Sequence, residues 1–174
     1  SDTAVVVIGR AAGEDRENTL TKGSYYLTDE EENLLDCVCS SFKKVVVILD
    51  CGSIMDMEWT LKYGDKISSI LYVWQNGMES GNSVADVLSG AVSPCGKLSD
   101  TVAVNYDCYP SSKFFGNKQY NEYTEDIYVG YRFFETFAKN QVLYPFGFGL
   151  SYTDFEVKVT QTRCVGDVIT AFVN

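Results

Sequence analysis

The chain has 174 residues, of which 45% are hydrophobic and 14% aromatic, a composition typical of a globular domain rather than a disordered chain. Its 24 acidic and 14 basic residues give a formal net charge of −10, and no Lys/Arg cluster is present that could neutralise phosphates. No stretch approaches the roughly 20 apolar residues that a membrane-spanning helix needs. We therefore expect neither nucleic acid nor a membrane as a partner.

The histidine and cysteine content restricts the available chemistry. The chain has no histidine, which excludes His-based triads and His-ligated metals. Its six cysteines are scattered without a Cys-x-x-Cys pair, so we expect free, mostly buried thiols and no metal or cofactor. The start of the chain also lacks the basic and apolar regions of a signal peptide. These features indicate a cytoplasmic protein.

A run of five apolar residues, 4–8, leads directly into a glycine-containing loop that carries charges of both signs. A continuous run rich in β-branched residues is typical of a strand buried on both faces, as in parallel sheets covered by helices. In such sheets, ligands bind beyond the carboxyl ends of the strands. Glu14 follows this strand, so the pattern places it where an α/β domain carries out its chemistry.

The first helix is predicted to start at a capping box, in which Thr28 is followed three residues later by Glu31. The helix is expected to end near Lys43 and Lys44. Its apolar face is predicted from helical spacing to consist of Leu34, Leu35, Val38 and Phe42.

Two further apolar runs, residues 45–49 and 67–74, are predicted strands, with a weaker helical segment at residues 54–63 between them. This alternation predicts an α/β fold with a doubly wound, mostly parallel sheet and helices on both faces, a three-layer sandwich. Three loops would then emerge at one edge of the sheet, which is the candidate site. They are residues 13–16, 50–53 and 75–81.

The next part of the chain is less regular. Asn82 is expected to cap a short helix that ends at a left-handed Gly90. A strand at residues 101–104 precedes a polar, tyrosine-rich loop at residues 106–123, whose length indicates a function. Aromatic residues alternate with glycines at residues 144–152, which predicts a tight turn wedged against a neighbouring segment.

The last part of the chain has a different pattern. Residues 155–159 and 168–173 alternate apolar and polar side chains, which is typical of half-buried antiparallel strands. Two strands are only marginally stable alone, so we expect them to be the first strands of a β-sandwich domain. Both ends of the chain fall in or beside strands, which indicates a fragment of a longer protein.

Several motifs follow one another along the chain: Val-Ile-Gly-Arg followed by Gly-Glu-Asp-Arg, and residues 72–81, 85–90, 93–98, 127–132 and 144–152. In this order they resemble the C-terminal α/β sandwich domain of family 3 glycoside hydrolases of the β-glucosidase type. The resemblance implies that residues 1–153 form this domain, with its first strand and helix missing, and that residues 154–174 begin a fibronectin type III-like domain. Some members, especially from gut and rumen bacteria, carry their barrel domain last, so the domain order stays open.

The resemblance also implies an activity. Members of this type hydrolyse terminal β-linked glycosides with retention of configuration, using an aspartate nucleophile from a barrel domain that this chain does not contain. The sandwich domain supplies the general acid/base, and the matching position is Glu14, with Asp15 and Arg16 as substrate-binding candidates. Relatives often have Gly-Glu-Gly before the Asp-Arg pair, and this departure leaves other acids open. The alternative candidates are Glu17, Glu79, Glu122 and Glu125.

The implied partners are a β-linked glycoside and the barrel domain of the same enzyme, while a homo-oligomer stays open. The fragment alone is expected to be inactive, because retention needs two carboxyl groups about 5 Å apart. The acid must be protonated near neutral pH, which Arg10 and Arg16 would oppose unless they face partners such as Asp15 or Glu17. Two alternatives stay open. In one, Glu14 is a loop carboxylate paired with Arg16; in the other, the chain is a non-catalytic ligand-binding or scaffold module.

Overall fold

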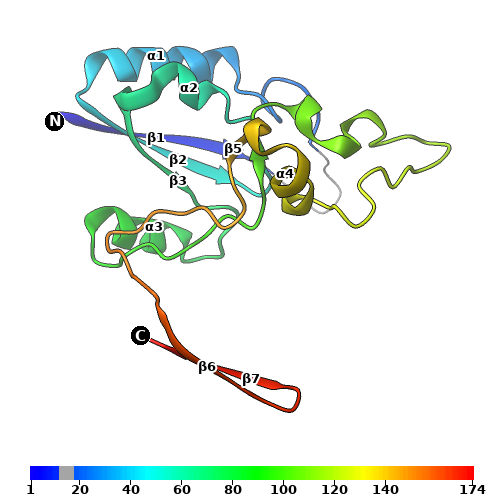
Figure 1. The fold of residues 1–174 in the computed structure, drawn as a ribbon. Coiled ribbons are helices and arrows are strands. Elements are labelled where there is room, and N and C mark those ends of the chain that lie inside the picture. The colour runs from blue at the N-terminus through cyan, green and yellow to red at the C-terminus, as the bar shows by residue number, and fades with distance from the viewer. Residues whose placement is uncertain (12–17) are drawn as a thin grey trace.

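The computed structural model describes residues 1–11 and 18–174, which contain a three-stranded parallel sheet in the order β1-β2-β3. The strands are β1 (Thr3–Arg10), β2 (Lys44–Cys51) and β3 (Ile67–Tyr72). Helices α1 (Asp29–Ser41) and α2 (Trp59–Tyr63) lie over one face, and α3 (Ser80–Ser89) lies on the other side (Figure 1). The predicted α/β fold with a parallel sheet is therefore confirmed.

The remaining elements are short and lie mainly in the second half of the chain. Strand β4 (Val102–Ala103) pairs antiparallel with β5 (Val142–Tyr144), and β6 (Val159–Val165) pairs antiparallel with β7 (Val168–Val173). Helix α4 (Tyr131–Phe137) precedes β5. The 3-10 helices are Gly64–Lys66, Tyr106–Cys108, Pro110–Lys113 and Lys139–Gln141.

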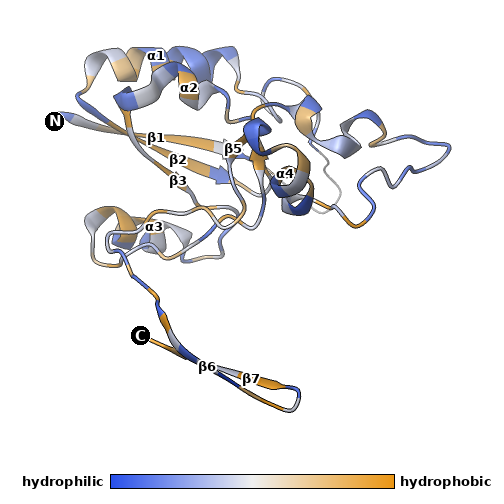
Figure 2. Ribbon diagram, viewed as in Figure 1, coloured by the Kyte–Doolittle hydropathy of each residue, from blue (hydrophilic) through white to orange (hydrophobic). Residues whose placement is uncertain are grey.

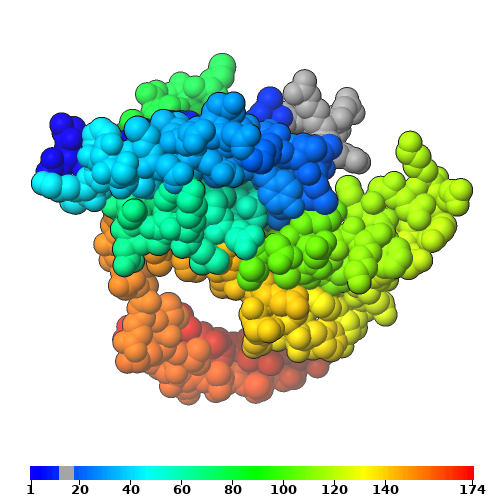
Figure 3. All heavy atoms as spheres, turned by 90° about the horizontal axis from the view of Figure 1, so that it is seen from above, coloured from blue at the N-terminus to red at the C-terminus, as the bar shows by residue number. Residues whose placement is uncertain are grey.

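Strand β1 is buried on one face only. Val6 and Ile8 are 4% and 1% exposed, whereas Val5 and Val7 are 52% and 61% exposed. The prediction that this strand is buried on both faces is therefore wrong. The reason is that β1 is an edge strand of the described sheet and that its Val5 and Val7 side is left open. Figure 3, seen from above, shows α1 and α2 over the opposite side.

The main core lies between the sheet and α1 and α2. The fully buried side chains of this core include Ile8, Leu35, Val45, Val47, Leu49, Cys51 and Met55. Figure 2 shows that apolar residues run along most of β1 and β2. Burial of this apolar surface is the main force that holds the helices on the sheet.

Helix α1 begins at the predicted capping box. The Thr28 hydroxyl accepts from the Glu31 N–H at 3.1 Å, and the Glu31 carboxylate accepts from the Thr28 N–H at 2.9 Å. The predicted apolar face is confirmed for Leu35, which is buried, and for Val38, which packs against the core. It is wrong for Leu34, which is 46% exposed, whereas Cys39 is buried. Phe42 is also exposed. The helix ends at Ser41, before the predicted end near Lys43 and Lys44, and Phe42 has an extended backbone.

Three predicted boundaries shift in the structure. The helix predicted from residue 54 begins at Trp59, because the Asp56 N–H bonds to the Tyr25 carbonyl instead of a helical carbonyl. Strand β3 ends at Tyr72, before Trp74, whose left-handed φ of 56° is incompatible with a strand. Helix α3 begins at Ser80, so Asn82 lies inside its first turn and is not its cap.

The glycine-aromatic segment packs against a distant stretch of chain, as predicted. The Leu98 N–H bonds to the Phe148 carbonyl at 2.8 Å, and the Gly147 N–H bonds to the Leu98 carbonyl at 2.8 Å. A Cβ atom at position 149 would lie 2.3 Å from the Gly96 carbonyl oxygen. Gly149 is therefore required for this close approach of two backbones.

The β6–β7 hairpin is antiparallel, as predicted, but every residue in both strands is exposed. Its first strand begins at Val159 rather than at residue 155. The predicted half-burial is wrong for the described chain, because the hairpin extends away from the α/β part and packs on no second sheet within it (Figure 1). Apolar side chains such as Ile169 and Phe172 are consequently open to solvent.

All six cysteines are free, as expected, but only Cys39 and Cys51 are buried. The expectation that most of them are buried is therefore wrong, because Cys37 lies on the exposed side of α1 and the other three lie outside the main core. Among the described residues, no helix is long and apolar enough to cross a membrane.

Candidate functional site

The carboxyl ends of the three parallel strands meet at one edge of the sheet. Arg10, at the end of β1, pairs in register with Cys51, at the end of β2. Strand β3 ends with Tyr72 opposite Leu49 of β2. The segments that follow the strands therefore start at a common edge, as the alternation of strands and helices predicts.

The predicted acid Glu14 lies outside the described residues. The same holds for the substrate-binding candidates Asp15 and Arg16 and for the alternative acid Glu17. These four assignments stay predictions. The structure describes β1 before them and the chain from Asn18 after them, and these flanking parts contain a network of polar contacts.

Arg10 is held by a bidentate ion pair with Glu31. Its Nη1 and Nη2 atoms lie 2.5 and 2.6 Å from the two carboxylate oxygens. The guanidinium also donates to the carbonyls of Gly9, Ser24 and Tyr26. The two charged side chains are only 11% and 20% exposed. The pair therefore ties the end of β1 to the loop before α1 and to the first turn of α1.

The charges of this pair compensate each other. Burial alone would raise the pKa of Glu31, but hydrogen bonds from Arg10 and from the Thr28 N–H outweigh it and hold the pKa below its ordinary value. The same hydrogen bond to Glu31 raises the pKa of Arg10. Arg10 thus faces a carboxylate of α1, so its positive charge is neutralised close to the edge of the sheet.

Cys51 is the buried thiol at this edge. Its Sγ atom lies 3.7 Å from the Ile8 carbonyl, to which it donates, and 3.8 Å from the Met55 sulfur. Burial raises the pKa of the Cys51 thiol to about 11. It is therefore protonated at neutral pH and unsuited to act as a nucleophile, because the thiolate is the reactive form.

Asp56 is a partly buried carboxylate that the sequence patterns did not single out. It lies between the buried side chains of Met55 and Met57, and it makes no ion pair among the described residues. Burial raises the pKa of Asp56, while its hydrogen bond from the Glu58 N–H works in the opposite direction. In the sequence, an acidic residue between two methionines, Met55 and Met57, is the pattern that could have indicated this carboxylate.

A second feature that the sequence patterns did not indicate is a contact between the segments that follow β2 and β3. Trp74 has a left-handed backbone with φ 56°, which is uncommon for a bulky residue and marks local strain. Its ring packs on Tyr72 with a centroid distance of 4.4 Å. The Tyr72 hydroxyl donates to the Ser53 carbonyl at 2.6 Å. This backbone conformation depends on tertiary contacts, so no local sequence pattern reveals it.

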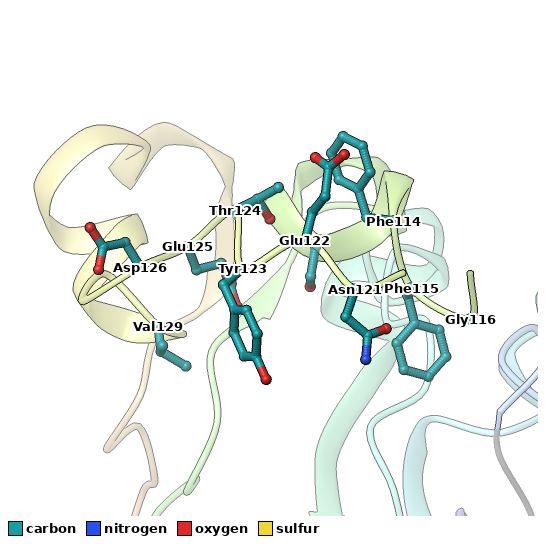
Figure 4. Close-up of a pocket in the computed structure, with 11 residues that line it drawn as sticks. Phe114, Phe115, Gly116, Asn121, Glu122, Tyr123, Thr124, Glu125, Asp126 and Val129 are labelled. Carbon is teal, nitrogen blue, oxygen red and sulfur yellow. The ribbon is translucent and has the colours of Figure 1, made fainter. Parts of the chain in front are cut away.

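The other three alternative acids lie in two separate places. Glu79 is the residue before α3, and its carboxylate accepts a hydrogen bond from the Asn82 side chain. Glu122 and Glu125 line a hollow that we call the 111–129 pocket, which is lined by residues 111, 114–116, 121–126 and 129 (Figure 4). None of these carboxylates forms an ion pair within the described part of the chain. Their role as acids stays a prediction.

Comparison with known proteins identifies the family of this chain. A model of the glycosyl hydrolase family 3 C-terminal domain matches residues 1–152. The chain is 49% identical over 172 residues to a β-glucosidase from Ruminococcus albus and 42% identical over 180 residues to β-glucosidase A from Butyrivibrio fibrisolvens. These matches cover 98% and 89% of this chain but only 18% and 22% of the two relatives.

Solved structures agree with the sequence relatives. A β-glucosidase from Paenibacillus barengoltzii has a TM-score of 0.93 at 46% identity, over 99% of this chain and 19% of that protein. A β-glucosidase from Kluyveromyces marxianus in complex with glucose has a TM-score of 0.84 at 32% identity, over 99% of this chain and 20% of that protein. The chain thus spans about a fifth of the length of these proteins. By fold and by sequence, it belongs to the glycosyl hydrolase family 3 C-terminal domain family.

Proposed function

We propose that this chain is part of a retaining β-glycosidase of the β-glucosidase type, which removes terminal β-linked sugars from oligosaccharides or glycosides. The observation that carries the proposal is the family match over residues 1–152, together with relatives named β-glucosidases. A barrel domain outside this chain is proposed to supply the aspartate nucleophile. The fragment alone is then expected to be inactive.

Glu14 is proposed as the general acid/base. It follows β1 in the sequence, and β1 ends at the edge where the carboxyl ends of the parallel strands meet. In a retaining mechanism one carboxylate attacks the anomeric carbon while the other carboxylic acid protonates the departing oxygen, and the two groups lie about 5–5.5 Å apart. The carboxylate that remains after this proton transfer then acts as the base and deprotonates the water that releases the sugar from the covalent intermediate.

The charge balance at the sheet edge supports this role. A general acid has to be protonated near the working pH, and a nearby uncompensated cation would lower its pKa. Arg10 does not act in this way, because Glu31 neutralises it. A docked nucleophile carboxylate would raise the pKa of Glu14 through its negative charge.

The test uses the complete protein and replaces Glu14 by Gln and by Ala. Turnover is measured on aryl β-glycosides with good and poor leaving groups. General acid catalysis contributes roughly 10²- to 10⁴-fold, so we expect a loss of this order for poor leaving groups and a much smaller loss for good ones. Azide is expected to restore turnover in Glu14→Ala, because it attacks the glycosyl-enzyme without needing a base.

Matched variants separate the candidates. Glu17→Gln, Glu79→Gln, Glu122→Gln and Glu125→Gln are expected to keep the leaving-group dependence of the unmodified protein. Equal losses on good and poor leaving groups in the Glu14 variants would show that Glu14 is not the acid. A complete protein without glycosidase activity would instead favour a scaffold or ligand-binding module.

A further inference from the structure

Trp74 has a backbone conformation that the turn at this position does not require of a tryptophan. Its left-handed φ of 56° is unfavourable for any residue with a Cβ atom, whereas glycine adopts it readily. The chain turns here because it leaves β3 and continues into α3, on the opposite side of the sheet from α1 and α2 (Figure 1). A glycine would make the same turn without strain, so the large ring is present at a cost to stability.

The ring gains little burial in exchange. Trp74 is only partly buried, and within the described chain its one aromatic contact is with Tyr72, at a centroid distance of 4.4 Å and an interplanar angle of 35°. Its indole N–H donates no hydrogen bond to any described residue. Every residue of the following segment, 75–79, is exposed, and α3 has no buried residue. Core packing of the described residues therefore does not compensate the strain.

Trp74 packs beside a group of side chains that joins the ends of the three parallel strands. The Tyr72 hydroxyl donates to the carbonyl of Ser53, in the segment after β2, at 2.6 Å. Burial raises the pKa of Tyr72, Cys51 acts in the same direction and Arg10 acts against it, so both groups lie within electrostatic reach. Cys51 and Arg10 are the last residues of β2 and β1. Trp74 thus lies at the sheet edge that the proposed catalytic site uses.

Strained residues cluster at functional sites, where the strain holds a group in a position that an unstrained chain would not adopt. We propose that Trp74 is a positioning residue of the glycosidase reaction: its ring on Tyr72 and its left-handed backbone hold residues 75–79 and the segment after β2 at the edge where the sugar reacts. This inference rests on the proposed glycosidase function. Trp74 acts on kcat through these segments, since a small displacement near a reacting centre costs up to about 100-fold in rate.

The test uses the complete protein and three substitutions of Trp74 that separate the ring from the strain. Trp74→Phe keeps an aromatic ring on the same backbone. Trp74→Ala removes the ring and keeps the strain, whereas Trp74→Gly removes both. The matched control is Tyr131→Ala, which removes one ring of an exposed stack in α4, where the Tyr131 and Phe146 centroids lie 4.5 Å apart. The rate constant kcat and KM are measured on an aryl β-glycoside.

We expect kcat to fall on the order of tenfold in both Trp74→Gly and Trp74→Ala, with KM changed by less than about twofold, because the segments lose their position while no group that binds the substrate is removed. Trp74→Phe is expected to keep most of the activity.

Stability is expected to follow the strain instead of the activity. It is measured by hydrogen exchange of the Val73 amide, which donates to the Leu49 carbonyl at 2.9 Å. This amide should open roughly fivefold less often in Trp74→Gly than in Trp74→Ala, because only the alanine is strained at this φ. The glycine variant would then be the more stable of the two without being the more active.

A further variant tests the connection to the segment after β2. Tyr72→Phe keeps the ring and removes only the hydrogen bond to the Ser53 carbonyl. Because Tyr72 and Trp74 are inferred to act as one unit, the double variant Tyr72→Phe/Trp74→Gly should lose no more of kcat than Trp74→Gly alone. Fully additive losses would contradict the inference that the two residues hold these segments together.

Other results would also overturn the inference. An unchanged kcat in Trp74→Gly would show that the ring serves the fold alone, and so would losses of kcat that follow the losses of stability from variant to variant. A rise in KM at unchanged kcat would show a direct contact with the substrate instead. An equal loss of kcat in Tyr131→Ala would mean that any exposed stack has this effect. Failure of the glycosidase proposal is seen separately, as absent turnover of the aryl glycoside by the unmodified protein.

Discussion

The bidentate ion pair between Arg10 and Glu31 joins the end of β1 to the first turn of α1, so we expect Glu31→Ala to loosen this turn. Removing one partner of a fully buried pair costs about 3–5 kcal/mol, whereas an exposed pair contributes about 0–1 kcal/mol. Both side chains are mostly buried, at 11% and 20% exposure, but Arg10 keeps three carbonyl acceptors. We therefore expect a loss of about 2 kcal/mol, or about 30-fold in the local opening equilibrium.

The assay is hydrogen exchange of the complete protein at residues 24–32, since local opening is measured there without assuming two-state unfolding. Glu31→Gln keeps an oxygen for the Thr28 N–H, so it loses the charge but retains the cap, and we expect about half the effect of Glu31→Ala. The control is Asp29→Asn, in the same first turn of α1, which breaks an exposed ion pair with Lys22 of the preceding loop and is expected to change little.

The pH dependence has a defined direction. Because the pKa of Glu31 is lowered in the folded protein, its contribution is present above the ordinary pKa of glutamate and is lost as the pH falls through the lowered value. The unmodified protein and Glu31→Gln should therefore converge in strong acid. Unchanged exchange in Glu31→Ala, or a change no larger than that of Asp29→Asn, would refute the assignment of this pair as the tie between β1 and α1.

Two further predictions concern packing and buried charge. Gly149→Ala places a Cβ atom 2.3 Å from the Gly96 carbonyl oxygen, so the two backbones must separate at a cost of about 1–3 kcal/mol, seen as faster hydrogen exchange at residues 96–98. Gly96→Ala meets no atom within 4 Å and should be nearly neutral; similar exchange in both variants would contradict the steric argument. Asp56→Asn should slow exchange at residues 55–60 near neutral pH, because burial raises the pKa of Asp56 and its ionised form is disfavoured. This advantage should vanish as the pH falls through the raised pKa, and an Asn variant that exchanges faster at neutral pH would show an unrecognised partner for the carboxylate.

The local signals in the sequence were sufficient for the fold class. Continuous apolar runs predicted the strands that became β1, β2 and β3, and the Thr28–Glu31 capping box predicted the start of α1. Gly90 at the end of α3 has the expected left-handed conformation, with φ 79°. These features depend on residues a few positions apart, so a sequence pattern can carry them.

The candidate site could be predicted only in part. The alternation of strands and helices was enough to place the ends of the strands at one edge, because parallel pairing follows from the connections between them. The residue that neutralises Arg10 was not predictable, since Glu31 is 21 positions away and already has a role in the capping box. Asp56 and Trp74 were missed for a related reason, because burial and a left-handed backbone are imposed by contacts with distant segments.

The sequence by itself therefore determined the α/β class, the parallel strands, the first capping box and the family to which the chain is similar. Only the tertiary structure decided which face of β1 is covered, how Gly149 meets Gly96, and where the rings of the 111–129 pocket point. The physical reason is that periodicity and caps act through neighbouring residues, whereas burial, charge compensation and pocket shape arise between segments that only folding brings together.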